Sequence, residues 1–167
     1  MKAFTSILYL LPLAAAAPFD IVKRDLPDHT PVNIPDLDSD FDVKCGKTTV
    51  KGRDINNAVS WGVNLERAGE KLGSNEYPHY YGNNGAQKRF NFLSDDCNKY
   101  PQNLRKEFPI VKGDTFNGDN DEAGKFRAIY LHDPNSSTDY EGNPTAHYCG
   151  TIYHKGDDFE GCDVKKN

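Results

Sequence analysis

The amino-acid sequence predicts an α+β domain in which one N-terminal helix packs on an antiparallel sheet of four to five strands. Two observations indicate this class. Helical periodicity occurs once, near residues 54–65, and short aromatic and β-branched runs follow from residue 76 onward. A single helix that precedes several antiparallel strands packs on one face of their sheet. Long loops and two disulfides complete the expected fold.

The helix is expected to begin at Asp54, because a short acidic side chain caps the free amide groups of a first helical turn. Apolar or small residues then recur at helical spacing: Ile55, Ala58, Val59, Gly62, Val63 and Leu65. Gly69 and Gly73 are expected to end the element.

The strands are expected in five runs that are rich in aromatic and β-branched residues. These runs are 77–81, 90–93, 107–111, 125–131 and 148–154. Turn-forming pairs separate them, among them Asn84-Gly85, Asn117-Gly118 and Glu141-Gly142.

The first residues are predicted to be a signal peptide, residues 1–17, that directs the protein outside the cell. Met1-Lys2 gives a basic start, residues 3–13 are mostly apolar, and four alanines at 14–17 supply a small-residue cleavage site. Lys23-Arg24 predicts dibasic processing after Arg24. No apolar run is long enough to span a bilayer, so a membrane-embedded protein is excluded.

Residues 18–42 are expected to form an acidic pro-segment or flexible arm, and residues 43–167 the structured domain. The stretch 25–42 carries six Asp and three Pro without Lys or Arg, too little apolar surface to offset the entropy of ordering. The whole chain has a formal net charge of −5, which argues against coating nucleic acid by bulk charge. Residues 43–167 carry 17 basic and 18 acidic side chains, so the domain itself is nearly neutral.

Four cysteines in a secreted chain predict two disulfides, and three pairings are open. The nested pairing of Cys45 with Cys162 and Cys97 with Cys149 would stabilise the fold by about 4–5 kcal/mol for each loop in the chain-entropy treatment. A zinc site is the alternative. It is disfavoured because no Cys-x-x-Cys occurs and no His stands at ligand spacing from a Cys.

Five polar residues on the predicted strands suit chemistry at a phosphate. Tyr77 and His79 are two residues apart and therefore point to the same face of a strand. Glu107, Arg127 and His154 stand on three later strands. Each residue taken singly is better explained as a surface charge or a structural side chain.

Taken in order, the segments around these residues resemble the fungal extracellular guanyl- and purine-specific ribonucleases, a superfamily that also contains the sarcin-like ribotoxins. The segments are Tyr77-Pro78-His79, Glu107-Phe108-Pro109, 126–130 and 149–154. The resemblance covers roughly Cys45 to Cys162. It implies the microbial ribonuclease fold and the nested disulfide pairing.

The resemblance also implies a mechanism without metal or cofactor, in which the RNA 2′-hydroxyl attacks the adjacent phosphorus and forms a 2′,3′-cyclic phosphate. Glu107 matches the base and His154 the acid of that reaction. His79, Arg127 and Tyr77 match the groups that contact the phosphate. Phe159 resembles an apolar residue on the far side of the site. RNA is then the partner, with neither membrane nor nucleotide cofactor, and a monomer is expected.

The base-reading loop departs from the guanine-specific members. Tyr81 can stack on a base, and Asn83 and Asn84 can present amide groups, but the carboxylate that accepts the guanine N–H groups is missing. Strict guanine specificity therefore stays open, and a plain hairpin turn at Asn83-Asn84-Gly85 is the alternative.

Two other functions remain alternatives to a ribonuclease of broad action. A ribotoxin uses a long, Lys-rich loop between the Glu and Arg positions, whereas residues 113–124 here are short and acidic, which is repulsive toward RNA. A non-catalytic secreted effector or binding module normally loses the acid, base or Arg, which are all present. Residues 132–147 form an extended loop with a glycosylation acceptor at Asn135.

Overall fold

The computed structural model describes residues 26–37, 40–82, 91–119, 122–135, 138–156 and 158–165. The signal peptide and the dibasic site that the sequence predicts lie outside these ranges, as do Asn83 and Asn84. None of the helices in the described ranges has the length and apolarity that crossing a membrane requires.

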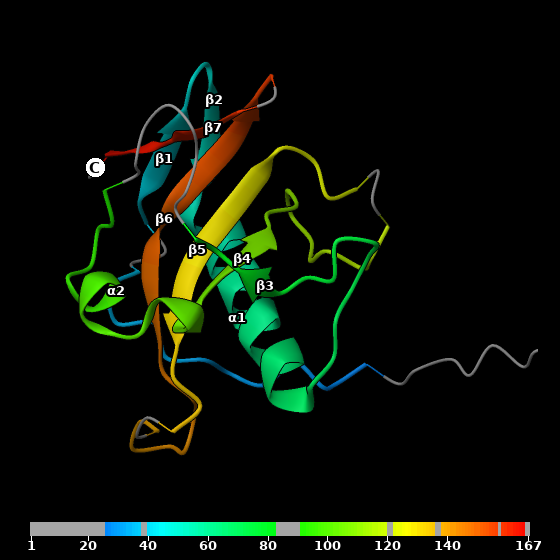
Figure 1. The fold of residues 1–167 in the computed structure, drawn as a ribbon, viewed down its shortest axis with the longest axis vertical. Helices are drawn as coiled ribbons and strands as arrows, with labels where there is room; N and C mark the ends of the chain where they lie inside the picture. Colours follow the sequence, from blue (N-terminus) through cyan, green and yellow to red (C-terminus); the bar gives the residue numbers. More distant parts are fainter. Residues whose placement is uncertain are drawn as a thin grey trace, which may run out of the picture.

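The main sheet has five antiparallel strands in the order β3-β4-β5-β6-β7. Their bounds are β3 His79–Tyr80, β4 Arg105–Pro109, β5 Phe126–His132, β6 Ala146–Lys155 and β7 Asp158–Gly161. A smaller sheet has the order β2-β1-β8, with β1 Asp42–Cys45, β2 Thr48–Lys51 and β8 Asp163–Lys165. Figure 1 shows the main helix, α1, Gly52–Ala68, lying behind the strands of the main sheet. The expected α+β class is confirmed.

The helix begins two residues before the expected cap. Lys51 is the N-cap residue and makes no side-chain cap hydrogen bond. Asp54 is instead buried, and its Oδ1 accepts a hydrogen bond of 3.1 Å from the Gly113 amide, so it anchors the loop after β4. The end was predicted correctly: the helix stops at Ala68, and Gly69 follows in the left-handed conformation with φ 70°.

Gly62 lets the helix approach the sheet closely. A Cβ atom added to it would lie 2.8 Å from the hydroxyl oxygen of Tyr130 on β5, closer than a real contact allows. Tyr130 is fully buried between α1 and the sheet. The small residue therefore belongs to the packing of the interface, although glycine within a helix costs about 1 kcal/mol relative to alanine.

Strands β5 and β6 overlap the predicted runs closely and β4 lies two residues earlier than predicted, but residues 91–93 form no strand. Phe92 packs against a cluster of buried side chains beside the sheet, and the Leu93 amide donates a hydrogen bond of 3.0 Å to the Cys149 carbonyl. Their apolar character reflects this packing rather than a strand ladder. Strands β1, β2, β7 and β8 are short and mostly polar, so the sequence does not predict them.

The two disulfides have the nested pairing that the resemblance implies. Cys45 pairs with Cys162, which joins β1 to the chain just after β7. Cys97 pairs with Cys149, which joins the short helix α2, Asp96–Lys99, to β6. A 3₁₀ turn, η1 Gln102–Leu104, then leads into β4.

Apolar side chains cover both faces of the main sheet. Ala128 and Tyr130 of β5 belong to the core beneath α1. Ile129 and Leu131 alternate with them and so face the opposite side, where they join the Cys97–Cys149 disulfide in a second cluster. Residues 91–104 contribute Phe92 and Leu104 to this second cluster and cover part of that face.

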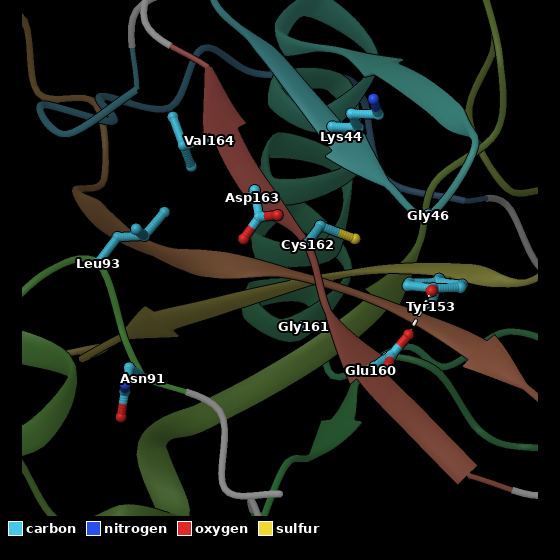
Figure 2. A pocket seen from close by; sticks show the side chains of 10 residues that line it. All are labelled: Lys44, Gly46, Asn91, Leu93, Tyr153, Glu160, Gly161, Cys162, Asp163 and Val164. Atoms are coloured by element: carbon cyan, nitrogen blue, oxygen red, sulfur yellow. Dashed lines mark hydrogen bonds between the residues drawn. The ribbon is translucent and has the colours of Figure 1, made fainter.

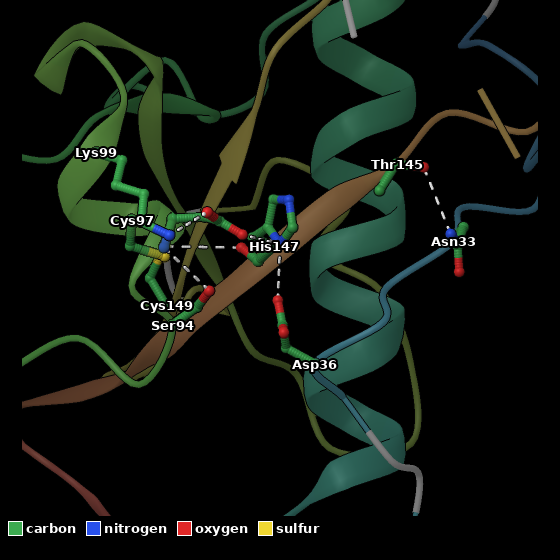
Figure 3. A network of polar contacts seen from close by, with 9 residues as sticks. Asn33, Asp36, Ser94, Cys97, Lys99, Thr145, His147 and Cys149 are labelled. Atoms are coloured by element: carbon green, nitrogen blue, oxygen red, sulfur yellow. Dashed lines mark hydrogen bonds and ion pairs between the residues drawn. A yellow bond between two sulfur atoms is a disulfide. The ribbon is translucent and has the colours of Figure 1, made fainter. Parts of the chain in front are cut away.

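Residues 29–37, here named the N-terminal strap, pack against the domain. The ring of His29 stacks on Trp61 of α1 at 4.0 Å between centroids. Asn33 forms a parallel bridge with Thr145, its amide donating to the Pro144 carbonyl at 2.9 Å. Figure 3 shows the strap beside the start of β6, where His147 lies 2.7 Å from the Asp36 carboxylate.

The strap falls within the stretch expected to be a flexible arm. Two of its apolar side chains, Ile34 and Leu37, are each only 7% exposed and belong to the main core. Residues 18–42 are acidic on average, so their composition does not reveal that Ile34 and Leu37 can enter a core. Whether the leader is cut after Arg24 stays a prediction, and we propose that the folded unit includes the strap.

Replacing Leu37 with alanine is predicted to lower the free energy of unfolding by about 2–5 kcal/mol, because it leaves a cavity in the core. Leu26 provides a matched control, since it is 43% exposed; its replacement with alanine should change stability by less than about 0.5 kcal/mol. Urea denaturation of both variants measures the difference. Equal stability of the two variants would contradict the strap's place in the core.

Candidate active site

His79 and Glu107 face each other across β3 and β4. The two residues are register partners, and His79 Nε2 lies 2.6 Å from Glu107 Oε1. On the other side of the ring, Nδ1 lies 2.7 Å from the Asn75 carbonyl oxygen. A carbonyl only accepts, so Nδ1 carries a hydrogen and donates it. The imidazole is thereby oriented with Nε2 toward the carboxylate.

The hydrogen bond to Glu107 raises the pKa of His79, and burial opposes this effect only in part. Glu107 is itself 7% exposed, whereas a third of the His79 side chain is exposed, so water screens the pair in part. The carboxylate therefore stabilises the charged form of the imidazole.

Arg127 holds a fixed guanidinium beside this pair. Its Nη1 donates to the carbonyl oxygens of Ala123, Gly124 and Phe126 at 2.8, 3.0 and 2.9 Å. Its Nε donates to the Tyr77 hydroxyl at 2.9 Å, and its Cζ lies 5.1 Å from the centre of the Tyr77 ring. In the described part of the chain no carboxylate comes within ion-pair distance of Arg127.

Tyr77 lies next to His79, as the sequence predicts. The centroids of the two rings are 4.6 Å apart, and Tyr77 is almost completely buried. Because its hydroxyl oxygen accepts from Arg127, its own hydrogen stays free to donate.

His154 and Phe159 occupy the other side of the face. They are register partners on β6 and β7, and their ring centroids are 4.0 Å apart. Burial lowers the pKa of His154, the charge of Arg127 lowers it further, and Glu107 acts in the opposite direction. Both charges therefore act on His154, and Arg127 stands on the strand between Glu107 and His154.

The sheet order brings one predicted residue from each strand to the same face. From β3 to β7 these are His79, Glu107, Arg127, His154 and Phe159. Neighbouring strands are about 4.8 Å apart. A carboxylate and an imidazole that flank a guanidinium on one face are suited to proton transfer on both sides of a bound phosphate.

Tyr81 stands at the edge of this face. Burial raises the pKa of its hydroxyl to about 12, and Glu107 and Arg105 act on it in opposite directions. Its ring meets Phe92 edge to face, at 6.5 Å and 78°. The remaining residues of the predicted base-reading loop, Asn83 and Asn84, lie outside the described residues.

Two residues of this region escaped the sequence analysis. Arg105 is 4% exposed, and its Nη1 donates to the Cys97 carbonyl at 2.9 Å. Asn75 orients His79 through its carbonyl. The sequence could have identified Arg105 as part of the site, since it precedes Glu107 by two residues and so shares its face of the strand. It could not have identified Asn75, because Asn75 acts through its backbone.

Two other predictions concern sites away from this face. Asn135 is exposed, and its amide donates to Asp133 Oδ1 at 2.9 Å; its glycosylation stays a prediction. Over the described ranges no three or more His, Cys, Asp or Glu side chains gather in a way that could hold a metal ion.

A groove of about 680 Å³ lies elsewhere, beside β1, β7 and β8 (Figure 2). Its lining includes Lys44, Asn91, Glu160 and Asp163 and none of the predicted catalytic residues. Glu160 accepts hydrogen bonds from the Tyr153 hydroxyl and from Lys155 Nζ, the latter at 3.0 Å. The groove thus carries carboxylates rather than a phosphate-binding cation cluster.

One face of the sheet thus carries a carboxylate, two imidazoles and a guanidinium, a set of groups suited to acid–base chemistry at a phosphate. A family model described as ribonuclease matches residues 38–163, well over half of the chain. The chain therefore belongs to this microbial ribonuclease family. Comparison with curated proteins gave no match.

The two imidazoles of the site are predicted to titrate in opposite directions. NMR titration should place the pKa of His79 above 6.5 and that of His154 below it, so that His154 loses its proton first. Glu107→Gln should lower the pKa of His79, because the amide cannot stabilise an imidazolium as a carboxylate does.

The raised pKa of His79 also predicts how the stability of the fold depends on pH, which urea denaturation at several pH values measures. The pKa of His79 is raised by folding, so its pairing stabilises the fold fully below pH 6.5 and is lost as the pH rises through the raised value. A pKa of His79 that is unchanged in Glu107→Gln would show that the pair does not set its charge.

Proposed function

We propose that the protein is a secreted, metal-independent endoribonuclease that cleaves single-stranded RNA through a 2′,3′-cyclic phosphate. Membership of a ribonuclease family supports RNA as the substrate class. The observation that carries the reaction type is the placement of Glu107 and His154 on the strands flanking that of Arg127.

In the first step the ribose supplies its own nucleophile, which is already held beside the phosphorus. Glu107 takes the proton from the 2′-hydroxyl as the bond from O2′ to phosphorus forms. The bond from phosphorus to O5′ breaks, and protonated His154 gives its proton to the departing oxygen. In the second step water opens the cyclic phosphate, with the two residues in exchanged roles.

Arg127, Tyr77 and His79 act on the phosphate oxygens, where negative charge increases in the transition state. Three carbonyls and the Tyr77 oxygen hold the guanidinium before substrate arrives. Little reorganisation is then required when the charge develops. The Tyr77 hydroxyl has its hydrogen free to donate, and His79 Nε2 lies 2.6 Å from the carboxylate of Glu107, the base.

His154 has a lowered pKa in the free protein, which suits the donation of a proton. The phosphate beside it would favour the charged imidazolium when RNA is bound. Binding of RNA therefore favours the protonated form of His154, which is the form that acts as the acid.

A purine preference with a leaning toward guanine belongs to the proposal, and Tyr81 is the aromatic residue on which the base would stack. Secretion also belongs to it. Its supports are the two disulfides, which form in oxidising compartments, and the leader pattern of residues 1–17.

The loop between β4 and β5 favours this activity over that of a ribotoxin. Its described residues include Asp114, Asp119 and Glu122. The Glu122 carboxylate accepts a hydrogen bond of 2.7 Å from Asn117. The loop ends in the Ala123 and Gly124 carbonyls that hold Arg127. Its contacts serve the site rather than a polyanion.

Glu107→Gln and His154→Ala are each predicted to remain folded and to cleave RNA about 10²–10⁴-fold more slowly, the usual effect of removing a general base or acid. Lys106→Gln and Lys155→Gln are matched controls. They change the neighbouring residue on the same strand, whose side chain points to the other face. Cleavage of a fluorogenic oligoribonucleotide measures all four rates. Activity within threefold of the parent protein in either site variant would remove that residue from the mechanism.

Digestion of homopolymeric RNAs beside intact ribosomes, with a chelator present, separates the three functions. Broad cleavage of free RNA is the expected result, since the site has no need of a metal ion. A single cut in ribosomal RNA would indicate a ribotoxin, and an absence of cleavage would indicate a binding module.

A further inference from the structure

Arg105 is a buried cation without a described anionic partner. It is 4% exposed, and in the described part of the chain its Nε has no hydrogen-bond partner. Placing a guanidinium in such surroundings costs free energy that an apolar side chain of similar size would not. Stability alone therefore gives a poor account of this residue.

The contacts of Arg105 lead to the aromatic edge of the candidate site. Its Cζ lies 4.7 Å from the centre of the Phe92 ring, and its Nη1 donates to the Cys97 carbonyl at 2.9 Å. Its own carbonyl accepts a hydrogen bond of 3.0 Å from the Tyr81 amide. One residue thus contacts three segments: the chain after β3, the segment before α2, and α2 itself.

Phe92 connects this cation to Tyr81. The Phe92 ring meets the Tyr81 ring edge to face, and an edge-to-face contact depends on the orientation of both rings. Arg105 packs on one face of Phe92, and Phe92 contacts Tyr81, so the three side chains form a continuous array. Arg105 also shares the strand and the face of Glu107, which places this array beside the base of the reaction.

We propose that Arg105 is a positioning residue that orients the Tyr81 ring, through Phe92, as the stacking surface for the RNA base next to the reacting 2′-hydroxyl. This role rests on the proposed ribonuclease activity. It names Arg105 as the residue that determines how well the RNA base stacks on Tyr81. A planar guanidinium is suited to the task because it stacks on the Phe92 ring while its edge donates to a carbonyl. Lysine and methionine can each do only part of this.

The test uses two substrates that differ only in the base. One is a dinucleoside monophosphate with a purine on the 2′-hydroxyl side, and the other carries an abasic ribose at that place. In Arg105→Met the KM for the purine substrate should rise by about tenfold or more, as expected when a base stacks poorly on an aromatic ring. The kcat/KM for the abasic substrate should stay within twofold. Arg105→Lys should recover little of the loss.

Arg53→Met is the control for loss of charge, because Arg53 is exposed on α1 and lies on the covered side of the sheet. It should leave both substrates unaffected. If Arg105→Met does not fold, Phe92→Leu tests the same link, since leucine fills the site but presents no ring to Tyr81. The same selective rise in KM is expected.

An equal loss on both substrates, in either variant, would overturn the proposal and assign Arg105 a merely structural role. An unchanged KM for the purine substrate would also overturn it. Failure of the ribonuclease proposal is distinguishable, because the parent protein would then cleave neither substrate.

Discussion

The packing of α1 on one face of the five-stranded sheet is the constraint on which the rest of the protein depends. Tyr130 reaches the helix at Gly62, where a larger residue would not fit. Once this face is covered, alternation along β4, β5 and β6 sends Glu107, Arg127 and His154 to the other face. Residues 91–104 cover only part of that face. The polar side chains are thereby gathered on one face of the sheet, opposite the helix.

The charged side chains on this face are oriented by backbone groups as much as by other side chains. Arg127 is held by three carbonyls and His79 by one, so neither depends on a single side-chain partner for its orientation. The two imidazoles then acquire opposite properties from their surroundings. His79 pairs with a carboxylate and has a raised pKa, whereas His154 is partly buried near Arg127 and has a lowered one. Separated pKa values of this kind are a common feature of catalytic sites.

The sequence predicts the parts of this protein that follow from local pattern. The helix end at Gly69 and strands β4 to β6 come from periodicity and turn residues. The disulfide pairing and the candidate catalytic residues came from the resemblance of ordered segments, since spacing alone left three pairings open.

Features determined by tertiary contacts could not be predicted in this way. Asp54 matches the pattern of a helix cap but binds the Gly113 amide instead. The strap appears disordered by composition, yet Ile34 and Leu37 enter the core beside α1. Residues 91–93 have the composition of a strand and form none, because Phe92 packs on Arg105. In each case a partner distant in the sequence determined the outcome.

In the proposed mechanism RNA supplies the nucleophile, while Glu107 and His154 transfer the protons. Phosphorus NMR of a purine dinucleoside monophosphate treated with the protein and a chelator tests it most directly, with the 2′-deoxy analogue measured beside it. We expect a 2′,3′-cyclic phosphate as the first product from the ribose substrate and no cleavage of the deoxy analogue. Cleavage of the deoxy analogue, or a linear phosphate formed without the cyclic intermediate, would contradict it.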